Sequence, residues 1–529
     1  MRFPRAAYHV LHMPRDATSP KQRSDEQLDA TSPSSASSPS TQEASRWPAF
    51  AVCAAVAVLT ILDLAKVNVT LGPIEHTLGA ASSDVQLIVA GYVLAFGILL
   101  VPSGRLGDLW NRKRLFLIGL VAFGLASLVC ALSVTTEMLI GGRILQGFAA
   151  GILMPQVLGL IQQLFTGQER GRAFGIFGAI VGLGTAFGPT IGGLLIGLLG
   201  EEAGWRWTFA MNVPLALIVL PFAWRLLPSK QEVARGQTLD LFGVALLGLA
   251  VLTTMLPFVL TSGRDTDNPA RWWLLAPAVA LFVGFILWER RYLRLGKTPV
   301  VDFALFRTPS YRYGVLITTL FFAAMPVGFL LVTLFLQQGL GHPAVLVGAV
   351  SVPYALTSAV VAAVSGKWTF HHGATLVAVG VALFAVGYAV VLVVTQLAEP
   401  ELSPYLVSAA LIISGAGAGL VMGANQMRML LHVPVEQAGI AGSFAQVGQR
   451  LGNAMGLAIG SSVFFAGVAA LQVAGTGPDT SSPVVQEAYK ASVAGGLIVV
   501  IGLSCITLVV AIIDLVGHRR RQRAQPAGE

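Results

Sequence analysis

Long apolar stretches, separated by short polar segments, run along the chain from about residue 49 to residue 515. A helix needs about 20 predominantly apolar residues to cross the hydrocarbon core of a bilayer, and these stretches repeatedly reach that length. The pattern predicts about fourteen spanning helices, at 49–71, 85–104, 115–134, 137–160, 173–199, 208–227, 241–262, 272–289, 313–336, 346–365, 374–396, 404–430, 440–470 and 491–515. An even number of spans puts both ends of the chain on one side of the membrane.

The charges between the spans indicate which side that is. Lys and Arg gather in every second connection, in 105-RLGDLWNRKR-114, 167-GQERGR-172, 225-RLLPSKQEVAR-235, 290-RRYLRLGK-297 and 518-HRRRQR-523. The intervening connections carry acids or almost no charge, except 264-RDTDNPAR-271, in which the arginines balance the aspartates. Because Lys and Arg concentrate in cytoplasmic loops, we expect a multi-pass protein of the cell membrane with both termini in the cytoplasm.

The composition supports a membrane protein. The chain of 529 residues is 55% hydrophobic and 11% charged, with a mean hydropathy of +0.73, which no ordinary soluble domain shows. Its 58 glycines and 27 prolines, spread through the apolar segments, fit closely packed and locally broken helices. The net charge of +8 follows the loops described above, so it gives no reason to expect nucleic-acid binding.

The sequence also predicts how the chain is divided. Residues 1–47 are polar and rich in Ser, Thr and Pro, which predicts a disordered cytoplasmic tail; Met13 offers an alternative start. A first six-helix bundle is then expected at 48–228, followed by a linker with two inserted spans at 229–312. A second six-helix bundle at 313–516 and a basic tail at 517–529 complete the chain. A weak repeat supports this layout, since 103-SGRLGDLWNRKRLFLIGLVAF-123 resembles 365-SGKWTFHHGATLVAVGVALF-384.

Four stretches resemble the major facilitator superfamily, and within it the fourteen-span drug:proton antiporter group. They are 104-GRLGDLWNRKR-114, 139-LIGGRILQGFAAG-151, 184-GTAFGPTIGG-193 and 443-SFAQVGQRLGNAMG-456. The resemblance implies an all-α integral membrane protein with the major facilitator fold, two six-helix bundles plus two inserted central helices. It also implies a transporter that exchanges a small organic molecule for protons.

The resemblance assigns roles to two of these stretches. Gly104, Asp108 and Arg112 would form a cytoplasmic gate, in which Asp108 accepts hydrogen bonds from a neighbouring helix N-terminus or pairs with an arginine. The fifth span would carry the exporters' motif, whose glycines allow close packing and whose proline permits a kink; its residues are Gly184, Gly188, Pro189, Gly192 and Gly193.

Four charges lie within the spans and away from their ends, at Asp63, Lys66, Arg143 and Arg450. By the rise of a helix, Asp63 lies roughly 21 Å from the cytoplasmic end of its span, and Arg143 about 9 Å from the opposite end, so the two reach a similar depth. Charges at that depth face the interior and are functional by default. We therefore expect Asp63, Lys66 and Arg143 to form a cluster in a cavity that Arg450 also lines, with Gln146 in the cavity and Asn68 as a supporting hydrogen-bond partner.

Two interpretations of Asp63 stay open. The resemblance places it in the family's first-span Asp-(x)4-Asn-Val pattern, with Asn68 and Val69, but Lys66 and Gly72 depart from that pattern. A carboxylate beside two cations is harder to protonate. Asp63 is then either the proton carrier or a structural counter-ion, and in the second case Lys66 is a candidate for the titrating group.

The interior charges sum to about plus two, which favours a neutral or anionic organic substrate over a quaternary cation. No metal site and no cofactor is expected, because 296-GKT-298 lacks the upstream glycine of a phosphate loop and the energy would come from the proton gradient. The expected partners are the substrate, protons and membrane lipid, and the protein is expected to be a monomer and not an enzyme. A proton-coupled importer and a non-transporting sensor on the same fold remain alternatives.

Overall fold

The computed structural model describes residues 39–229, 240–261, 268–297, 299–301, 303–473 and 483–524. The chain divides into residues 1–43 and residues 44–529, and the second unit holds the spans. Every regular element in the described residues is helical. The predicted disordered tail, residues 1–47, lies outside the described residues up to position 38, and α1 begins at Pro39, before the predicted start of the first span. Adding turns to an existing helix costs little, so the first spanning helix extends beyond its apolar stretch.

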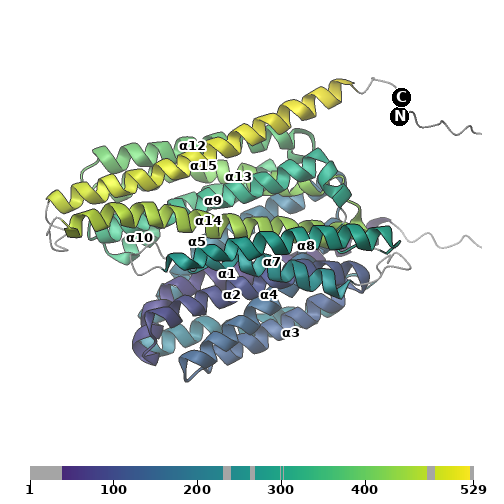
Figure 1. Ribbon diagram of the computed structural model, residues 1–529, viewed down its shortest axis with the longest axis horizontal. Coiled ribbons are helices and arrows are strands. Elements are labelled where there is room, and N and C mark those ends of the chain that lie inside the picture. Colours follow the sequence, from purple (N-terminus) through teal and green to yellow (C-terminus); the bar gives the residue numbers. More distant parts are fainter. Residues whose placement is uncertain are drawn as a thin grey trace, which may run out of the picture. The chain divides into compact units, whose positions relative to one another are not determined.

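Successive spans run antiparallel to one another (Figure 1). The bounds of the helices are α1 Pro39–Leu78, α2 Ser82–Leu109, α3 Arg112–Ala131, α4 Thr136–Leu164, α5 Gly167–Ala210, α6 Asn212–Leu226, α7 Leu241–Val259, α8 Leu275–Arg294, α9 Pro309–Leu334, α10 Ala344–Val350, α11 Val352–Ser365, α12 Thr369–Leu397, α13 Ser403–Leu430, α14 Ala438–Val473 and α15 Pro483–Ala524. Of these, α10 and α11 belong to one span. Short 3-10 turns precede α8, α9 and α14, and a π-helical turn, Phe335–Gly339, follows α9.

Thirteen stretches of the described residues are long and apolar enough to cross a membrane. One of them, Gly167–Leu226, runs over 60 residues and contains both α5 and α6, so the count of about fourteen spans is confirmed. α5 contains a non-helical residue at Gly200, with φ +79°, which lies in the connection between the predicted spans 173–199 and 208–227. The predicted span 346–365 is divided at Ser351, two residues before Pro353, into α10 and α11.

Each half of the chain packs around its own apolar core. We call α1–α6 the first half and α9–α15 the second half. In the first half α4 packs against α2 and α3, and in the second half α13 packs against α11 and α12. One core cluster draws mainly on residues from Ala49 to Leu305, and another on residues from Ile317 to Ala511. The inserted helices α7 and α8 pack against each other, and α7 also contacts α2 and α14.

The connections rich in Lys and Arg meet at one end of the helices, which we call the basic end. There the Lys113 ammonium donates to the Leu227 carbonyl oxygen at 2.9 Å, and the Asn111 side-chain amide donates to the Ser229 carbonyl oxygen at 2.9 Å. These bonds hold the start of α3 against the end of α6. The side chain of Asn111 also caps α3, because it accepts a hydrogen bond from the backbone N–H of Arg114.

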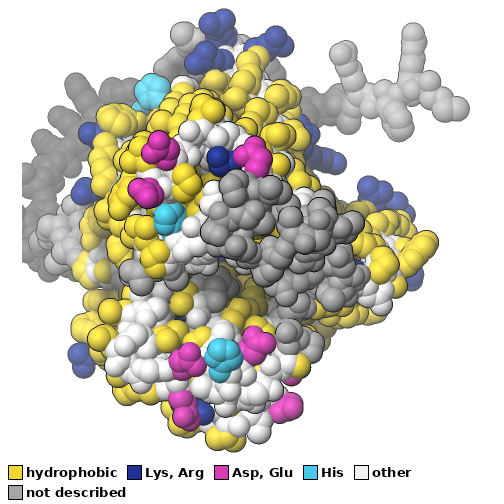
Figure 2. All heavy atoms as spheres, turned by 90° about the vertical axis from the view of Figure 1, so that its left-hand side faces the viewer, with side chains coloured by type: hydrophobic (Ala, Val, Ile, Leu, Met, Phe, Trp, Pro, Cys, Tyr) yellow, Lys and Arg dark blue, Asp and Glu magenta, His cyan; other side chains and the backbone are white. Residues whose placement is uncertain are grey.

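The opposite end, which we call the acidic end, holds the turns that carry most of the acids. At this end the Trp205 indole donates to the Thr77 hydroxyl at 2.9 Å, and His76 lies 3.5 Å from Glu201. Figure 2 looks onto this end and shows Asp and Glu side chains in two groups, with a hollow between them. The alternation of basic and acidic connections along the sequence therefore corresponds to two physical ends.

The two halves meet closely at the basic end. A methyl group on Gly104 of α2 would lie 2.7 Å from the Gly439 carbonyl oxygen of α14, and one on Gly366, just after α11, would lie 3.2 Å from the Gly171 carbonyl oxygen of α5. Gly104 and Gly366 occupy matching positions in the sequence repeat. The repeat thus corresponds to two equivalent contacts between the halves, in which only glycine leaves room for the facing backbone.

Candidate functional site

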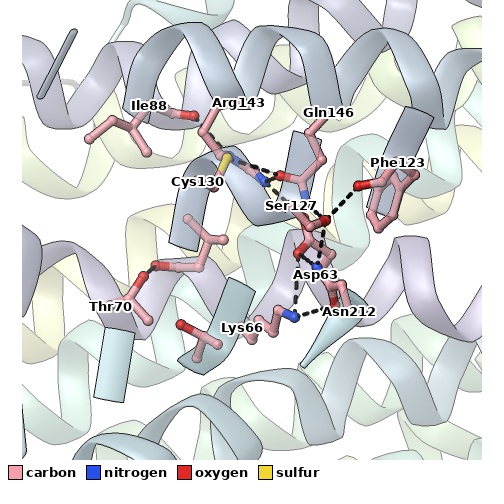
Figure 3. A network of polar contacts seen from close by, with 12 residues as sticks. Asp63, Lys66, Thr70, Ile88, Phe123, Ser127, Cys130, Arg143, Gln146 and Asn212 are labelled. Carbon is pink, nitrogen blue, oxygen red and sulfur yellow. Dashed lines mark hydrogen bonds and ion pairs between the residues drawn. The ribbon is translucent and has the colours of Figure 1, made fainter. Parts of the chain in front are cut away.

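A buried cluster of charged side chains joins three helices of the first half. Asp63 and Lys66 lie one turn apart on α1, Arg143 projects from α4, and Asn212 begins α6; all four side chains are fully buried (Figure 3). The Arg143 guanidinium lies 2.8 Å from one Asp63 oxygen, and the Asn212 amide donates to the other at 2.6 Å. The Lys66 ammonium donates to the Asn212 amide oxygen at 2.7 Å and lies 3.4 Å from Asp63.

A second layer of polar groups fixes the arginine. Gln146, one turn along α4, accepts a hydrogen bond from Arg143 at 2.6 Å and donates to the Ser127 hydroxyl of α3 at 2.8 Å. The Ser127 hydroxyl also accepts from Asn212 at 3.2 Å, so the layer closes into a network. The guanidinium of Arg143 lies 4.1 Å from the centroid of the Tyr92 ring on α2, within the range of a cation–π contact.

The glycines of the fourth-span stretch bring Arg143 to this ring. A methyl group on Gly147 would lie 2.4 Å from the Tyr92 carbonyl oxygen, and one on Gly151 would lie 2.8 Å from the Phe96 carbonyl oxygen. α4 therefore runs almost in backbone contact with α2 along two turns. The close approach places the arginine one turn away over the aromatic face.

The cluster holds one carboxylate against two cations in a region shielded from water. An uncompensated charge in this position is strongly unfavourable, and removing one partner of a buried ion pair typically costs 3–5 kcal/mol. Asp63 cannot gain a proton without weakening its bonds to the cations that hold it. Such an arrangement can couple the protonation of one group to the relative positions of α1, α4 and α6.

The glycines of the fifth span pack directly on the turn of α1 that carries these charges. A methyl group on Gly188 would lie 2.4 Å from the Ala65 Cβ, and one on Gly192 would lie 2.9 Å from the Lys66 carbonyl oxygen. Gly184 approaches Ile61 in the same way, at 3.3 Å, while Gly193 has only a looser contact. α5 stays helical through Pro189, and its one non-helical residue, Gly200, lies in the connection to the next span. The glycines of the motif therefore allow α5 to pack closely against α1.

The predicted gate residues lie at the contact between α2 and α14. The two Asp108 carboxylate oxygens accept hydrogen bonds from the backbone N–H groups of Gly439 and Ile440, each at 3.1 Å. Arg112 lies 2.7 Å from Asp108 and also donates to the Val435 carbonyl oxygen. Gly104 forms the close backbone contact described above. A carboxylate at the N-terminus of α14, with an arginine beside it, therefore joins the two halves at the basic end.

Arg450, which was expected to line the same cavity, makes no hydrogen bond or ion pair with Asp63, Lys66 or Arg143 in the described part of the structure. It projects from α14 of the second half toward α2 of the first, and its guanidinium carbon lies 4.5 Å from the centroid of the Phe96 ring. Tyr92 and Phe96 are one turn apart on α2 and stack with their centroids 6.1 Å apart. Arg143 and Arg450 thus lie against neighbouring rings on the same helix.

Sequence reasoning missed three members of this region. Asn212, Ser127 and Tyr92 are neutral side chains in or beside apolar runs, so they carry no charge signal that would separate them from packing residues. Asn68, the expected supporting partner, has a side chain outside the described part of the structure. Asn212 instead makes the supporting hydrogen bonds, from a different helix.

Two further observations complete the interior. A further buried ion pair, Arg428 of α13 with Asp514 of α15, lies toward the basic end of the second half. Among the described residues, no three His, Cys, Asp or Glu side chains are placed so that they could hold a metal ion.

Comparisons with known proteins agree with this architecture. Residues 53–457 match the model of the Major Facilitator Superfamily. A probable actinorhodin transporter of Streptomyces coelicolor is 34% identical over 433 residues, which cover 80% of this chain and 73% of the relative. The puromycin resistance protein pur8 of Streptomyces alboniger is 32% identical over 469 residues, covering 88% and 90%. A tetracenomycin C resistance and export protein of Streptomyces glaucescens is 29% identical over 415 residues, covering 78% and 75%.

Solved structures show the same fold. The human organic anion transporter MFSD10 superposes with a TM-score of 0.58 at 14% identity, over 88% of this chain and 99% of that one. The proton:xylose symporter XylE superposes with a TM-score of 0.56 at 13% identity, over 87% and 95%. The chain therefore belongs to the major facilitator superfamily, and it is a multi-pass membrane transporter and not an enzyme.

Proposed function

We propose that this protein exports a small organic molecule across the cell membrane in exchange for protons, by alternating access. The direction is supported by the relatives, one of which is described as a resistance and export protein and another as a resistance protein. The basic loops support an orientation in which the basic end and both termini face the cytoplasm.

The buried cluster of Asp63, Lys66, Arg143 and Asn212 is the observation that carries the proposal. Its single carboxylate holds two cations, so a proton that binds to Asp63 weakens at least one of these pairs and frees a cation to move. A proton lost from Lys66 has a related effect, because it removes the excess positive charge. In both cases the protonation state is tied to the packing of three helices, as an antiporter requires.

Transmission of that change to the rest of the molecule is supported by the packing of α5. Gly188 and Gly192 contact the backbone at Ala65 and Lys66, so a shift of the charged turn presses on α5. α5 in turn packs on α11 and α13 of the second half. A rigid-body rocking of the two halves would then expose the cluster alternately at the basic end and at the acidic end.

The test is transport in everted membrane vesicles that respiration has energised. Acidic, neutral and cationic compounds are added, and substrate-driven collapse of the pH gradient is followed for the wild-type protein and for Asp63→Asn. We expect collapse with wild type and none with the variant. Asp84→Asn is the matched control, because Asp84 lies at the acidic-end start of α2, away from the cluster, and should leave exchange intact.

The outcomes separate the alternatives. If Asp63→Asn still exchanges protons, Asp63 is a counter-ion, and loss of exchange in Lys66→Met would then identify Lys66 as the titrating group. Uptake of a compound in the direction of proton flow would show an importer. If no compound collapses the gradient even with wild type, the proposal of proton antiport fails.

A further inference from the structure

Arg450 is a cation between the two halves without a carboxylate partner among the described residues. It lies 12 residues into α14, or about 18 Å along the helix, well inside the membrane. Its side chain is only partly buried, although its Nε is shielded from solvent and has no hydrogen-bond acceptor. Because the guanidinium lies against Phe96 of the other half, the space it borders is between the halves and not in the lipid.

The one carboxylate of the charged cluster cannot serve Arg450. Asp63 already accepts from Arg143 and Asn212 and lies beside Lys66, so both of its oxygens are engaged. The cation–π contact with Phe96 replaces only part of the hydration that a guanidinium loses in this position. Binding of an anion would therefore stabilise the Arg450 guanidinium.

Two other polar side chains share the face of α14 that Arg450 occupies. Gln446 lies one turn before it and Asn453 one turn after it, at the spacings that place side chains on one side of a helix. The amide oxygens of both are shielded and have no donor, and Gln446 is only 6% exposed. A buried polar atom without a partner calls for an explanation, and one bound molecule would supply it for all three side chains.

The adjoining glycine face of α14 explains why these side chains are directed between the halves. Methyl groups on Gly452 and Gly456 would collide with the carbonyl oxygens of Thr319 and Ala323, so this face lies directly against α9 of the same half. The glycine face fixes α14 on the second half. The polar face is left to meet α2 and α4 of the first half.

We propose that Arg450, with Gln446 and Asn453, binds the exported molecule, and that this molecule is an organic acid with an apolar body. The guanidinium takes the carboxylate, and the two amides bind neighbouring hydroxyl or N–H groups. The mainly apolar walls of the spans contact the rest. The inference rests on the proposed function only in taking the bound molecule as the cargo.

The position of Arg450 also explains how a bound molecule can influence the charged cluster around Asp63. Arg450 and Arg143 lie on adjacent rings, Phe96 and Tyr92, so an acid at Arg450 is one turn of α2 away from the charged cluster. A quaternary cation would meet two arginines and Lys66, with one carboxylate already engaged. The arrangement therefore discriminates by charge.

The test is equilibrium binding to the full-length protein in lipid nanodiscs, without a pH gradient. The probes are matched pairs of radiolabelled acid and amide, 2-naphthoate with 2-naphthamide and anthracene-2-carboxylate with its carboxamide. Wild type should bind each acid about tenfold or more tightly than its amide. Arg450→Gln should weaken binding of the acids by about tenfold to a hundredfold and leave the amides almost unchanged, while Arg450→Lys keeps the preference.

A matched control uses Arg312→Gln, since Arg312 is exposed and also lies over an aromatic ring, Tyr313, with 5.0 Å to its centroid. This variant should retain the acid preference. Competition by acetate tests whether the apolar body is recognised, and acetate should compete far more weakly than 2-naphthoate.

Equal affinity of acids and amides for wild type overturns the proposal, and this arm needs no variant to fold. Absence of acid binding overturns it as well, and so does an acid preference that survives in Arg450→Gln or competition by acetate as strong as that by 2-naphthoate. Because no gradient is applied, these outcomes are independent of proton antiport. Failure of the binding site and failure of the proposed function are therefore distinguished.

Discussion

Asn212 is the residue at which the opposite charges of the interior meet. Its amide N–H group donates to Asp63, and its amide oxygen accepts from Lys66. A single neutral side chain thus satisfies an anion and a cation that are 3.4 Å apart and cannot both be solvated. Hydrogen bonds to charged groups are worth more than those between neutral groups, and a buried charge left without its partner is costly.

We expect Asn212→Leu to lower the free energy of unfolding by about 3–5 kcal/mol, because it leaves both charges incompletely satisfied. Asn425→Leu is the matched comparison. Asn425 is also buried, but it donates only to neutral groups, the Gly314 carbonyl oxygen and the Thr318 hydroxyl, so its loss should cost about 1–3 kcal/mol. Thermal unfolding of the purified variants shows which of the two loses more stability. An equal loss in both would show that the charges are stabilised without Asn212.

The charged members of this site were predictable, and its neutral members were not. Asp63, Lys66 and Arg143 stand out because each interrupts an apolar run, and the helical rise gives their depth. Asn212 is a single neutral polar residue at the start of α6, which the sequence alone does not distinguish from a packing residue. The separation of Arg450 from the cluster depends on which face of α14 meets α2, and one sequence does not contain that information.

At the scale of the helices, the contact between α1 and α5 is the one most sensitive to a small change. Gly188 leaves so little room that even a methyl group would overlap the Ala65 Cβ, at 2.4 Å. Because Ala65 adjoins Lys66, a displacement of the backbone at Ala65 also moves the turn of α1 that carries the charges. Three of the motif's glycines are therefore needed for the approach of two helices, while Pro189 does not break the helix.

We expect Gly188→Ala to destabilise the protein by about 1–3 kcal/mol through overpacking. If about 1.4 kcal/mol of that strain falls on the step in which α5 moves, exchange slows about tenfold. Gly197→Ala is the control on the same helix, since a methyl group there would meet nothing within 4 Å. Thermal unfolding and substrate-driven proton exchange are measured for both. Wild-type behaviour of Gly188→Ala would contradict the close contact.

The spans themselves were largely predictable from hydropathy, because the bilayer fixes the length of an apolar helix. The turn at Gly200 was predictable too, because it lies in the polar connection 200-GEEAGWR-206 between two predicted spans. The division at Ser351 has a local cause, since Pro353 has no N–H group to continue the helix, but hydropathy alone does not show it. The helical start of α1 before residue 48 was not predictable, because its polar composition resembles that of a flexible tail.

For the whole molecule, the relation of the two halves depends on contacts at the basic end. Gly104 against Gly439 and Gly366 against Gly171 are equivalent in the repeat, but only the first is reinforced by an acid. The two Asp108 oxygens accept hydrogen bonds from two backbone N–H groups at the start of α14, whereas the second loop has Phe370 at the corresponding position. The contact of α2 with α14 is therefore stabilised by a charged side chain as well as by close packing, whereas the contact of Gly366 with α5 is stabilised by close packing.

This asymmetry predicts that Asp108 holds the basic end closed across both contacts. Spin labels at Gln168 and Lys367, exposed positions at the α5–α11 side, report the separation of the halves once the exposed Cys505 is replaced by serine. In Asp108→Asn, which loses the negative charge facing α14 and Arg112, the distances should lengthen. Asp84→Asn, at the other end of α2, should leave them unchanged. Unchanged distances in Asp108→Asn would mean that glycine packing alone keeps the basic end closed.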